Sequence, residues 1–428
     1  MRPALQIALD FVDLHRAQGV AREAVRGGVD WIEVGTPLLK AEGLDAVRAL
    51  KKEFPAHTIV CDNKTMDAGR IEVESAAKAG AGVATVLGAA PDATIRECIE
   101  AGRTYGVKIA VDLANVADPA ARAKQAEDWG ADFVSVHCPI DQQMEGRDPF
   151  EALRAVAAAV SLPISVAGGI QSETAADAVK AGASVVVVGG AITKSENAEE
   201  ATRTFKRVLE TGVGEATEHF RRGGADDLRE LLSRPSVPNI SDGHHHMRVL
   251  DDLKPVVAGT HMVGRVLTVR TYPGDWAKPV EAIDVAEEGD VIVIDSGGVP
   301  PAIWGELATH SAVQKKLAGV VIHGAIRDTP VIRSLNFPAF ARQITARAGE
   351  PRGFGEIGAA IEIDGITVHT GDWIVGDDDG VAIIPRSQAV EIANRACDRM
   401  EMENRVRKEI EDGSTLAQVV DLYKWEKR

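Results

Sequence analysis

The sequence is poor in aromatic residues and in cysteine, and it contains no long apolar run. Aromatic side chains make up 4% of the 428 residues, so the core must consist mainly of small aliphatic side chains, which suits close packing of helices on strands. Four cysteines occur without a CxxC pair, so we expect reduced thiols and no disulfide framework. No apolar stretch approaches the roughly 20 residues of a membrane span, so we expect no membrane partner.

Basic residues are also in short supply. The chain has 48 Lys and Arg against 64 Asp and Glu, which gives a net charge of −16. An acidic chain has no general electrostatic attraction to nucleic acid, so we expect no nucleic-acid partner, and a phosphorylated substrate would have to be held by local features. Residues 1–10 lead directly into a strand pattern and leave no room for a signal peptide, so we expect a cytoplasmic protein.

The length exceeds one ordinary core, and the first half of the chain has the pattern of a barrel. Short apolar runs alternate with amphipathic helical stretches, the last of them at residues 198–210 before Gly212. The expected strands are residues 5–9, 31–34, 58–61, 83–87, 108–111, 133–137, 164–167 and 185–188. Eight strands alternating with helices predict a closed (β/α)8 TIM barrel.

The composition changes near residue 213, and the second half differs in pattern. Residues 213–227 are rich in glycine and charge, so we expect a barrel domain at 1–212, a linker at 213–227 and a second domain at 228–428. Strands are expected at residues 256–260, 263–270, 291–295, 319–323, 339–342 and 380–384, followed by a helix at 388–408. Glycine- and aspartate-rich turns between them predict a compact α/β/β (swivelling) domain.

Polar residues and paired glycines gather at the carboxyl ends of the barrel strands, which form the catalytic rim of this fold. They are Asp10, Glu33, Asp62, Asp112, His137, Gly168, Gly169, Gly189 and Gly190. Glycines after strands seven and eight allow backbone N–H groups to approach a phosphate, although tight βα turns need glycine as well.

The segment Asp62-x-Lys64-x-x-Asp67 is the most informative motif. Asp62 and Lys64 lie two apart on a strand and project to the same side, and Asp67 can fold back to the lysine. Such a cluster can bind a divalent cation, keep the lysine charged and stabilise an enediolate. The alternative is a solvated surface ion pair.

Two further groups fit metal-assisted proton transfer. Glu33 and Asp62 are candidate ligands for Mg²⁺, with Mn²⁺ also possible, because hard cations prefer carboxylate oxygens. A metal between a carbonyl and a neighbouring hydroxyl would acidify the intervening C–H. His137 is the natural general base or acid, and the alternative is a rim histidine bonded to backbone.

The first half resembles the 3-hexulose-6-phosphate synthase family of the orotidine-monophosphate decarboxylase superfamily. The resemblance is carried by residues 5–10, 33–37, 62–69, 86–88, 136–137 and 167–170. It implies an aldol reaction between formaldehyde and D-ribulose 5-phosphate, or its reverse, with Glu33 and Asp62 holding Mg²⁺. It also implies that His137 moves the C1 proton while Lys64 and Asp67 position and polarise the substrate, with Asp10 beside them.

The superfamily leaves one alternative for the barrel, a 3-keto-L-gulonate-6-phosphate decarboxylase. Residues 138–143 are close to the Asp-x-Gln pattern of the synthase, and the decarboxylase would place an arginine where this chain has Gly190. Both features favour the synthase. Cys138 and Pro139 depart from the small residues expected there.

The second half has its own cluster, in which Arg327 and Asp328 follow an apolar strand and Glu306 lies 21 positions before Arg327. Arg327 can bind a carboxylate with two hydrogen bonds, and Asp328 can bind a divalent metal. The alternative is an ordinary ion pair between the two.

This half resembles the family of the ribonuclease-E activity regulator and 4-hydroxy-4-methyl-2-oxoglutarate aldolase. The match is carried by residues 271–275, 297–298, 324–328, 371–372 and 377–380. It implies that Asp328 binds a metal directly, Glu306 through water, and that Arg327 holds a 2-oxo acid. A protein-binding regulator without chemistry stays open. The resemblances imply a homo-oligomer, as a barrel dimer and a trimer or hexamer of the second domain.

Overall fold

The computed structural model describes residues 2–217, 222–245, 247–250 and 252–420, so residues 218–221 of the expected linker lie outside it. The chain divides into two compact units. The first comprises Met1–Gln143, Arg147–Arg222 and Glu401–Arg428, and the second comprises Met144–Gly146 and Gly223–Met400.

Eight strands of the first unit form a closed parallel barrel in sequence order. They are β1 (Ala4–Leu9), β2 (Trp31–Val34), β3 (Thr58–Thr65), β4 (Val83–Leu87), β5 (Lys108–Asp112), β6 (Phe133–His137), β7 (Ile164–Ala167) and β8 (Val185–Val188). The pairing of β1 with β8 closes the ring, and the predicted TIM barrel is therefore confirmed.

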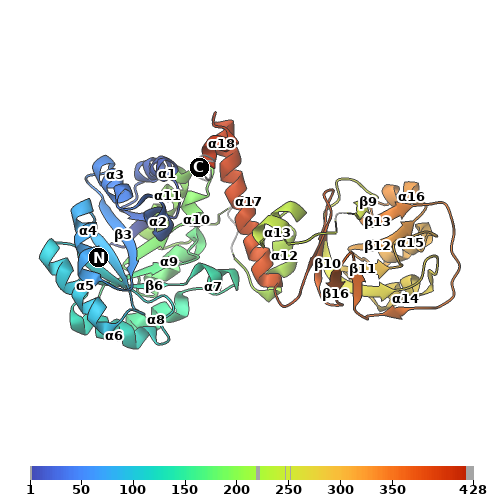
Figure 1. The fold of residues 1–428 in the computed structure, drawn as a ribbon, viewed down its shortest axis with the longest axis horizontal. Coiled ribbons are helices and arrows are strands. Elements are labelled where there is room, and N and C mark those ends of the chain that lie inside the picture. The colour runs from blue at the N-terminus through green and yellow to red at the C-terminus, as the bar shows by residue number, and fades with distance from the viewer. Residues whose placement is uncertain (1, 218–221, 246, 251, 421–428) are drawn as a thin grey trace. The chain divides into compact units, whose positions relative to one another are not determined.

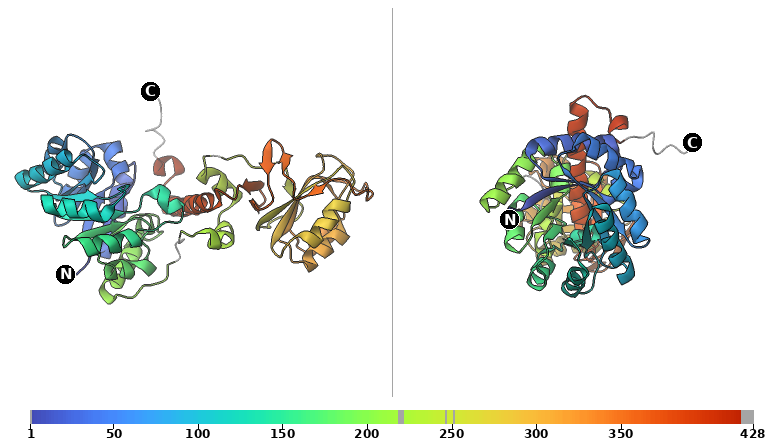
Figure 2. Two further views of the ribbon diagram at one scale, coloured as in Figure 1. Left: turned by 90° about the horizontal axis from the view of Figure 1, so that it is seen from below. Right: turned by 90° about the vertical axis from the view of Figure 1, so that its left-hand side faces the viewer.

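Helices surround the strands, as Figure 1 and the end-on view in Figure 2 show. They are α1 (Leu14–Gly27), α2 (Thr36–Glu42), α3 (Asp45–Glu53), α4 (Gly69–Ala79), α5 (Asp92–Tyr105), α6 (Pro119–Trp129), α7 (Ile140–Met144), α8 (Phe150–Ala159), α9 (Ser172–Lys180), α10 (Gly190–Thr193) and α11 (Ala198–Thr211). Gly212 ends α11 in the left-handed conformation that favours glycine.

The two-residue period of the strands separates core from site. On β2, Ile32 and Val34 belong to the core cluster that also contains residues of the surrounding helices. The alternate residues Trp31 and Glu33 face the barrel interior. Trp31 meets Phe133 of β6 edge to face at 5.5 Å, so apolar side chains fill the amino-terminal end of the interior. The interior positions near the carboxyl ends are therefore left for polar side chains.

The second unit is built on a mixed sheet with the order β18-β17-β10-β11-β12-β13-β9. Its strands are β9 (Lys254–Pro255), β10 (Met262–Arg270), β11 (Asp290–Asp295), β12 (Gly319–Ile326), β13 (Ala339–Ile344), β14 (Glu356–Ile357), β17 (Trp373–Gly376) and β18 (Val381–Ile384), with a separate hairpin of β15 (Ile361–Ile363) and β16 (Ile366–Val368). Strands β10 to β13 are parallel to one another.

Helices and the hairpin cover opposite faces of this sheet. The helices are α12 (Leu228–Leu232), α13 (Val237–Gly243), α14 (Ala277–Val285), α15 (Glu306–Gln314) and α16 (Thr329–Ser334), after a short 3-10 turn at Ala225–Asp227. Ile292 and Ile322 share a core cluster with Ile283 of α14, whereas Val293 shares another with Ile363 of the hairpin. This layering agrees with the predicted α/β/β domain.

One predicted strand, residues 256–260, is wrong. The strand in this region is β9, and the chain turns immediately after it. Val256 and Val257 are buried, Gly259 has φ +73°, and the Thr260 hydroxyl donates to the Val257 carbonyl at 2.9 Å. The apolar run therefore signals burial of a turn rather than an extended strand.

The C-terminal helix α17 (Ala389–Glu411) contributes to both units. Its residues up to Met400 belong to the second unit, and those from Glu401, together with α18 (Leu416–Val419), belong to the first. The expected domain 228–428 differs from the structure in this respect. The reason is a set of polar bonds from residue 405 onward to the barrel, described below.

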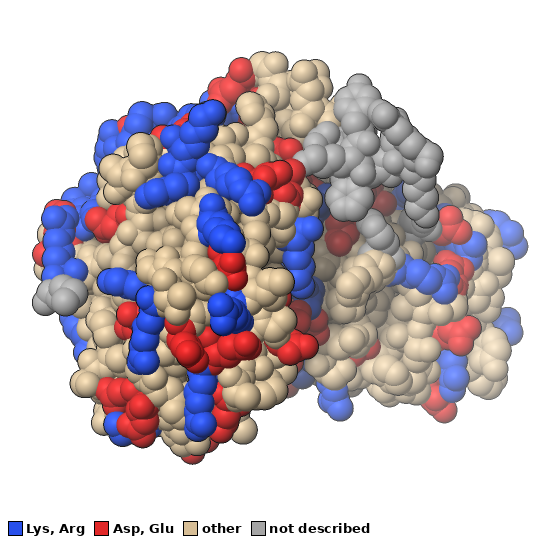
Figure 3. Space-filling model, turned by 60° about the vertical axis from the view of Figure 1, so that its left-hand side comes forward, with Lys and Arg blue, Asp and Glu red and all other residues tan. Residues whose placement is uncertain are grey.

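Two surface properties bear on the expected partners. Within the described ranges, no helix combines the length and the apolar character needed to cross a membrane. On the face drawn in Figure 3, acidic and basic side chains are interspersed. This face therefore lacks a continuous basic patch.

Candidate active site

Asp62 is the centre of the polar cluster at the carboxyl end of the barrel. Its buried carboxylate accepts hydrogen bonds from the Thr36 hydroxyl at 2.6 Å, the Thr85 hydroxyl at 2.8 Å and the Lys64 ammonium. The pairing of β3 with β4 shifts register between Cys61 and Thr65, so the strand bulges at the motif. The bulge brings Lys64 back onto the carboxylate two residues before it.

Lys64 lies between two carboxylates, as the sequence predicts, but the second is not the predicted one. Its ammonium pairs with Asp62 and, at 3.7 Å, with Asp112. Burial alone would lower the pKa of Lys64, but these two negative charges outweigh burial and raise the pKa above its ordinary value. Lys64 is therefore a permanent cation in the site.

The prediction that Asp67 folds back to Lys64 is wrong within this chain. Asp67 is exposed, and its carboxylate accepts the amide N–H of Ala68 at 2.8 Å. Both Lys64 and Ala68 have left-handed backbone, with φ of 48° and 52°, so the chain turns away after the lysine. Asp112 from β5 occupies the place that the sequence analysis gave to Asp67.

Asp112 and His137 form a buried hydrogen-bonded pair. The distance between His137 Nδ1 and Asp112 Oδ2 is 3.2 Å, and the other Asp112 oxygen accepts the Ala114 amide at 2.9 Å. Burial would raise the pKa of Asp112, but the bond from His137 and the charges of His137 and Lys64 hold it below the ordinary value. An ionised Asp112 favours the tautomer with the proton on Nδ1 and leaves Nε2 as the basic nitrogen.

Glu33 and Asp10 complete a group of close negative charges. Burial, followed by the charges of Asp62 and Asp10, raises the pKa of Glu33 well above its ordinary value, and Gln6 donates a hydrogen bond to it. Asp10 is exposed at the barrel mouth, yet enclosure by the barrel wall and the charge of Asp62 raise its pKa as well. A Cβ at position 35 would lie 2.2 Å from Asp10 Oδ1, so only Gly35 leaves room for this carboxylate.

The chemistry of this group fits a hard divalent cation. Glu33 and Asp62 supply carboxylate oxygens. Burial, followed by the neighbouring negative charges, raises the pKa of Glu33, and a bound cation would offset both effects. Across the described segments, no three His, Cys, Asp or Glu side chains converge closely enough to hold a metal by themselves. Mg²⁺ usually takes only one or two carboxylates and completes its shell with water and substrate, so two ligands suffice.

Gly168 and Gly169 form the turn after β7. Their φ angles are +101° and +74°, which only glycine adopts readily. Gln143 of α7 lies against this turn; it donates to the Cys138 carbonyl at 2.7 Å and accepts a hydrogen bond from Arg222. The guanidinium of Arg222 therefore lies at the turn that the sequence predicts to bind phosphate.

Gly189 and Gly190 follow β8 and open the one-turn helix α10. A Cβ at Gly190 would lie 3.5 Å from Cε of Lys194, and the charge of Lys194 also reaches Asp10. Each predicted glycine pair thus has one cationic side chain beside it, which suits a phosphate monoester.

Sequence reasoning missed the polar partners that organise this site. Thr36, Thr85 and Gln143 are bonded to predicted site residues or lie against them, and the inward-facing period of β4 could have identified Thr85. Asp112 was noted only as a rim residue. Arg222 lies in the expected linker and carries no sequence signal of its own.

In the second unit, Asp328 lies against Arg327 and against the main chain of Glu306. The Glu306 amide donates to Asp328 Oδ2 at 3.2 Å, and Arg327 Nε lies 3.4 Å from the same oxygen. Asp328 has φ +56° at the start of α16, and a Cβ at Gly305 would come within 2.5 Å of its carboxylate. All three side chains are substantially exposed.

A second polar group lies on β11 to β13 of this unit. His323 Nδ1 is 2.8 Å from Asp295 Oδ1, and its Nε2 is 2.8 Å from Nη1 of Arg342. Because arginine only donates, Nε2 is the acceptor of this hydrogen bond. The group ties three parallel strands together beside the Gly297–Gly298 turn.

Two family models match the chain, one in each half. Residues 3–205 match the orotidine 5'-phosphate decarboxylase / HUMPS family, and residues 237–383 match the RraA-like family, described as Aldolase/RraA. The second half thus carries an RraA-like domain.

Two relatives of the first half are 3-hexulose-6-phosphate synthases. The chain is 38% identical to the 3-hexulose-6-phosphate synthase of Bacillus subtilis over 49% of this chain and 99% of that protein. It is 43% identical to the 3-hexulose-6-phosphate synthase of Methylomonas aminofaciens over 44% of this chain and 90% of that protein.

Solved structures include barrels and an RraA protein. A 3-hexulose-6-phosphate synthase from Salmonella typhimurium is 38% identical, with a TM-score of 0.48 over 49% of this chain and 99% of that one. The RNA-processing inhibitor RraA from Thermus thermophilis is 29% identical, with a TM-score of 0.33 over 35% of this chain and 92% of that one. The identity to the synthases over nearly their whole length decides the assignment: through its N-terminal barrel the chain belongs to the 3-hexulose-6-phosphate synthase family and is an aldehyde-lyase.

Proposed function

We propose that the barrel joins formaldehyde to C1 of D-ribulose 5-phosphate and gives 3-hexulose 6-phosphate, and that it can run this reaction in reverse. The observation that carries the proposal is the bonded series Asp62–Lys64–Asp112–His137 at the barrel mouth. It places one permanent cation beside one base that is held in a defined tautomer.

His137 moves the proton. Its Nε2 takes a proton from C1 of the sugar phosphate, and the electron pair of the broken C–H bond becomes part of an enediolate. Asp112 holds the imidazole by Nδ1 and stabilises the imidazolium that forms. C1 of the enediolate then attacks the carbonyl carbon of formaldehyde, and the oxygen of formaldehyde takes up a proton to become the new hydroxyl.

Lys64 stabilises the charge that develops. Its ammonium is fixed by Asp62 and Asp112, so little reorganisation is needed when the enediolate forms beside it. When bound, a Mg²⁺ at Glu33 and Asp62 would supply a second positive charge for the two sugar oxygens. Mn²⁺ has the same ligand preference and could replace it.

The phosphate end of the substrate is assigned to the turns after β7 and β8. Gly168, Gly169, Gly189 and Gly190 offer backbone N–H groups, while Arg222 and Lys194 bring positive charge to the two turns. Local charge is required because the chain as a whole is acidic.

The test is consumption of formaldehyde by the purified protein with ribulose 5-phosphate and Mg²⁺, with and without chelator. We expect loss of formaldehyde in step with formation of a hexulose phosphate, and chelation should stop both. Release of CO₂ from 3-keto-L-gulonate 6-phosphate without formaldehyde consumption would instead assign the barrel to the decarboxylase alternative.

For the second unit we propose metal-dependent cleavage of a 2-oxo acid. The supporting observation is that Arg327 and the main-chain amide of Glu306 both lie against the Asp328 carboxylate. Arg327 would bind the substrate carboxylate, and the two acidic residues would hold the metal. Metal-dependent cleavage of oxaloacetate or of a pyruvate aldol, lost in Asp328→Ala, tests this role, and no such activity in the unaltered protein would favour a protein-binding regulator.

A further inference from the structure

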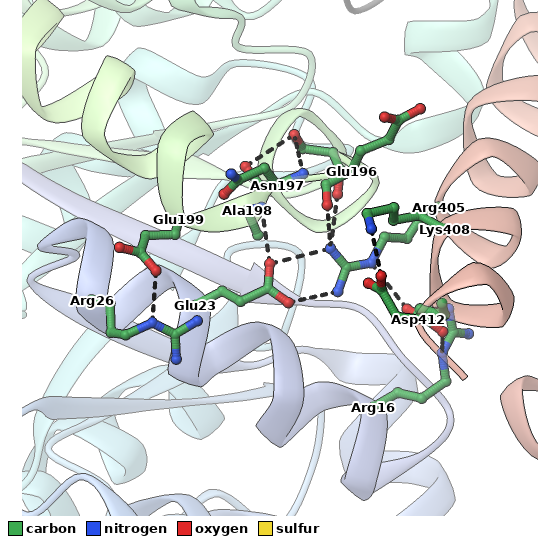
Figure 4. A network of polar contacts seen from close by, with 12 residues as sticks. Arg16, Glu23, Arg26, Glu196, Asn197, Ala198, Glu199, Arg405, Lys408 and Asp412 are labelled. Carbon is green, nitrogen blue, oxygen red and sulfur yellow. Dashed lines mark hydrogen bonds and ion pairs between the residues drawn. The ribbon is translucent and has the colours of Figure 1, made fainter. Parts of the chain in front are cut away.

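The last described residues of the first unit lie beyond both family matches. The matched regions end at residues 205 and 383, whereas residues 401–420 of α17 and α18 belong to the barrel unit. This segment is attached to the barrel by a network of polar bonds, drawn in Figure 4. The attached segment therefore lies outside the residues that match either family.

Arg405 is the centre of the network. Its guanidinium is directed at Glu23 of α1 and at the loop between α10 and α11 (Figure 4). It bonds Glu23 with two nitrogens, at 2.8 and 3.2 Å, and donates to the main-chain carbonyls of Ser195 at 2.9 Å and Glu196 at 3.4 Å. The residue is only 8% exposed, so these bonds are shielded from water.

Two further bonds fix the partners of Arg405. Glu409, which accepts the remaining Nε–H of Arg405 at 3.0 Å, is itself bound by Arg16 of α1. Glu23 also accepts the amide N–H of Ala198 at 3.0 Å, so the same carboxylate that holds Arg405 holds the start of α11. The loop before α11 is thus bound both directly by Arg405 and through Glu23.

This loop leads directly from the phosphate-binding end of the barrel. The Lys194 amide donates to the Gly190 carbonyl at 2.9 Å, and the Ser195 amide donates to the Ile192 carbonyl at 3.2 Å. The amides of Lys194 and Ser195 are therefore bonded back to α10, while the carbonyls of Ser195 and Glu196 accept hydrogen bonds from Arg405. A shift of the carbonyls of Ser195 and Glu196 would move Lys194 and the N–H groups of the glycines with it.

We propose that Arg405 is a positioning residue for substrate binding, through which the C-terminal helix sets the affinity of the barrel for the phosphate group of its substrate. The inference rests on the proposed function, because it takes the turn after β8 as the phosphate site. Arg405 does not touch the reacting atoms, so its loss should weaken binding of the phosphorylated substrate more than it slows the chemical step.

The competing interpretation is that Arg405 only anchors the helix. Both interpretations predict a lower melting temperature when the residue is replaced, since a buried network is broken. They differ in the kinetic constants, because an anchor alone would leave the KM for ribulose 5-phosphate unchanged in the folded fraction.

The experiment compares Arg405→Gln and Arg405→Lys with the control Arg407→Gln in the full chain. Arg407 lies two residues further along the same helix and is exposed. Within the described chain its side chain donates a hydrogen bond only to Asn404, at 2.8 Å. The three variants and the unaltered protein are measured for kcat, for the KM of ribulose 5-phosphate and of formaldehyde, for inhibition by inorganic phosphate, and for thermal melting.

We expect Arg405→Gln to raise the KM for ribulose 5-phosphate and the inhibition constant for phosphate about tenfold, with kcat and the KM for formaldehyde within about twofold. Arg405→Lys should recover part of the affinity, and Arg407→Gln should match the unaltered protein. If Arg405→Gln melts lower but keeps the KM of the unaltered protein, the inference fails and the proposed function stands.

Two further outcomes would also test the inference: a variant that does not fold, and an unaltered protein without turnover. If Arg405→Gln does not fold, the folded Arg405→Lys variant decides by the same constants, since lysine cannot make the bidentate bond to Glu23. If the unaltered protein shows no formaldehyde-dependent turnover, the proposed function fails. Calorimetric binding of ribulose 5-phosphate then tests the inference separately, and equal affinity in the unaltered and variant proteins would overturn it.

Discussion

The two candidate sites differ in how far one chain assembles them. In the barrel, Asp62 and Asp112 have side chains that are 7% and 4% exposed, and each makes hydrogen bonds or ion pairs to other members of the site. In the second unit, Arg327 and Asp328 have side chains that are 43% and 38% exposed. The same kinds of residue, carboxylates with a cation, are thus enclosed in one unit and open in the other.

The difference teaches what each site needs. A buried, bonded cluster is already oriented, so the barrel side chains need little rearrangement when substrate binds. An exposed Arg–Asp pair is screened by water and gains little from its own contact. The contact between Arg327 and Asp328 alone therefore does not orient the second group as burial orients the first.

The largest effect should come from removing the base or the centre of the barrel cluster. His137→Ala and Asp62→Ala should each lower formaldehyde-dependent kcat by at least about 10³-fold, because proton transfer and the orientation of Lys64 are lost. Circular dichroism checks that both variants fold. A folded His137→Ala protein with near-normal turnover would show that the barrel site is misplaced.

Asp112→Asn tests the orientation of His137 and should cost less. The amide cannot hold the imidazole by charge, so we expect kcat to fall about 10²-fold, with its pH profile displaced because the imidazolium is less stable. Steady-state rates across pH measure this. An unchanged pH profile would show that Asp112 has no part in the proton transfer.

The same substitution carries a stability prediction with a definite sign. The folded-state pKa of Asp112 lies below its ordinary value, so its stabilisation is present above the carboxyl pKa of about 4 and is lost as pH falls through the lowered value. The difference in free energy of unfolding between the unaltered protein and Asp112→Asn should therefore be constant near neutrality and shrink in acid. Urea unfolding at several pH values measures it.

Arg222→Gln tests whether the residue next to the β7 turn binds phosphate. We expect the KM for ribulose 5-phosphate to rise about tenfold with kcat little changed, because a charge-assisted bond to the phosphate is lost. Arg203→Gln is the control, since among the described residues Arg203 forms ion pairs only with glutamates of its own helix α11. Equal KM values in both variants would show that Arg222 does not bind the phosphate.

The smallest effect on the barrel should come from the second unit. Asp328→Ala should change formaldehyde-dependent turnover by less than about twofold, because Asp328 belongs to a separate unit and a separate site. The same variant should lose any metal-dependent 2-oxo acid cleavage. A large loss of barrel activity would mean that the two sites depend on each other.

The sequence predicted the fold best where the local apolar pattern alone sets the bounds of a strand. The predicted bounds of β2, β4, β6, β7 and β8 agree residue for residue with the structure, because each is a short apolar run between turn signals. The strand prediction for residues 256–260 was wrong, because a buried turn gives the same apolar pattern as a buried strand. The hairpin β15–β16 was missed, since its strands are only three residues long.

Site residues that lie at the ends of strands could be predicted from the sequence. Residues that reach the site only through tertiary contacts could not. Asp62, Glu33 and His137 follow from period two at the strand ends. Asp67 was wrongly joined to Lys64, because the left-handed turns at Lys64 and Ala68 leave no trace in the sequence. Arg222 lies 79 positions from its partner Gln143, and Arg405 lies 382 positions from Glu23. No local sequence pattern indicates such distant contacts.

The most direct test of the barrel site is exchange of the C1 hydrogen of ribulose 5-phosphate with deuterated water, followed by NMR without formaldehyde. Exchange requires only the proton transfer assigned to His137 and the enediolate held beside Lys64. We predict metal-dependent exchange by the unaltered protein and by Asp328→Ala, and none by His137→Ala. Exchange that persists in His137→Ala, or that is absent from the unaltered protein, would contradict the account.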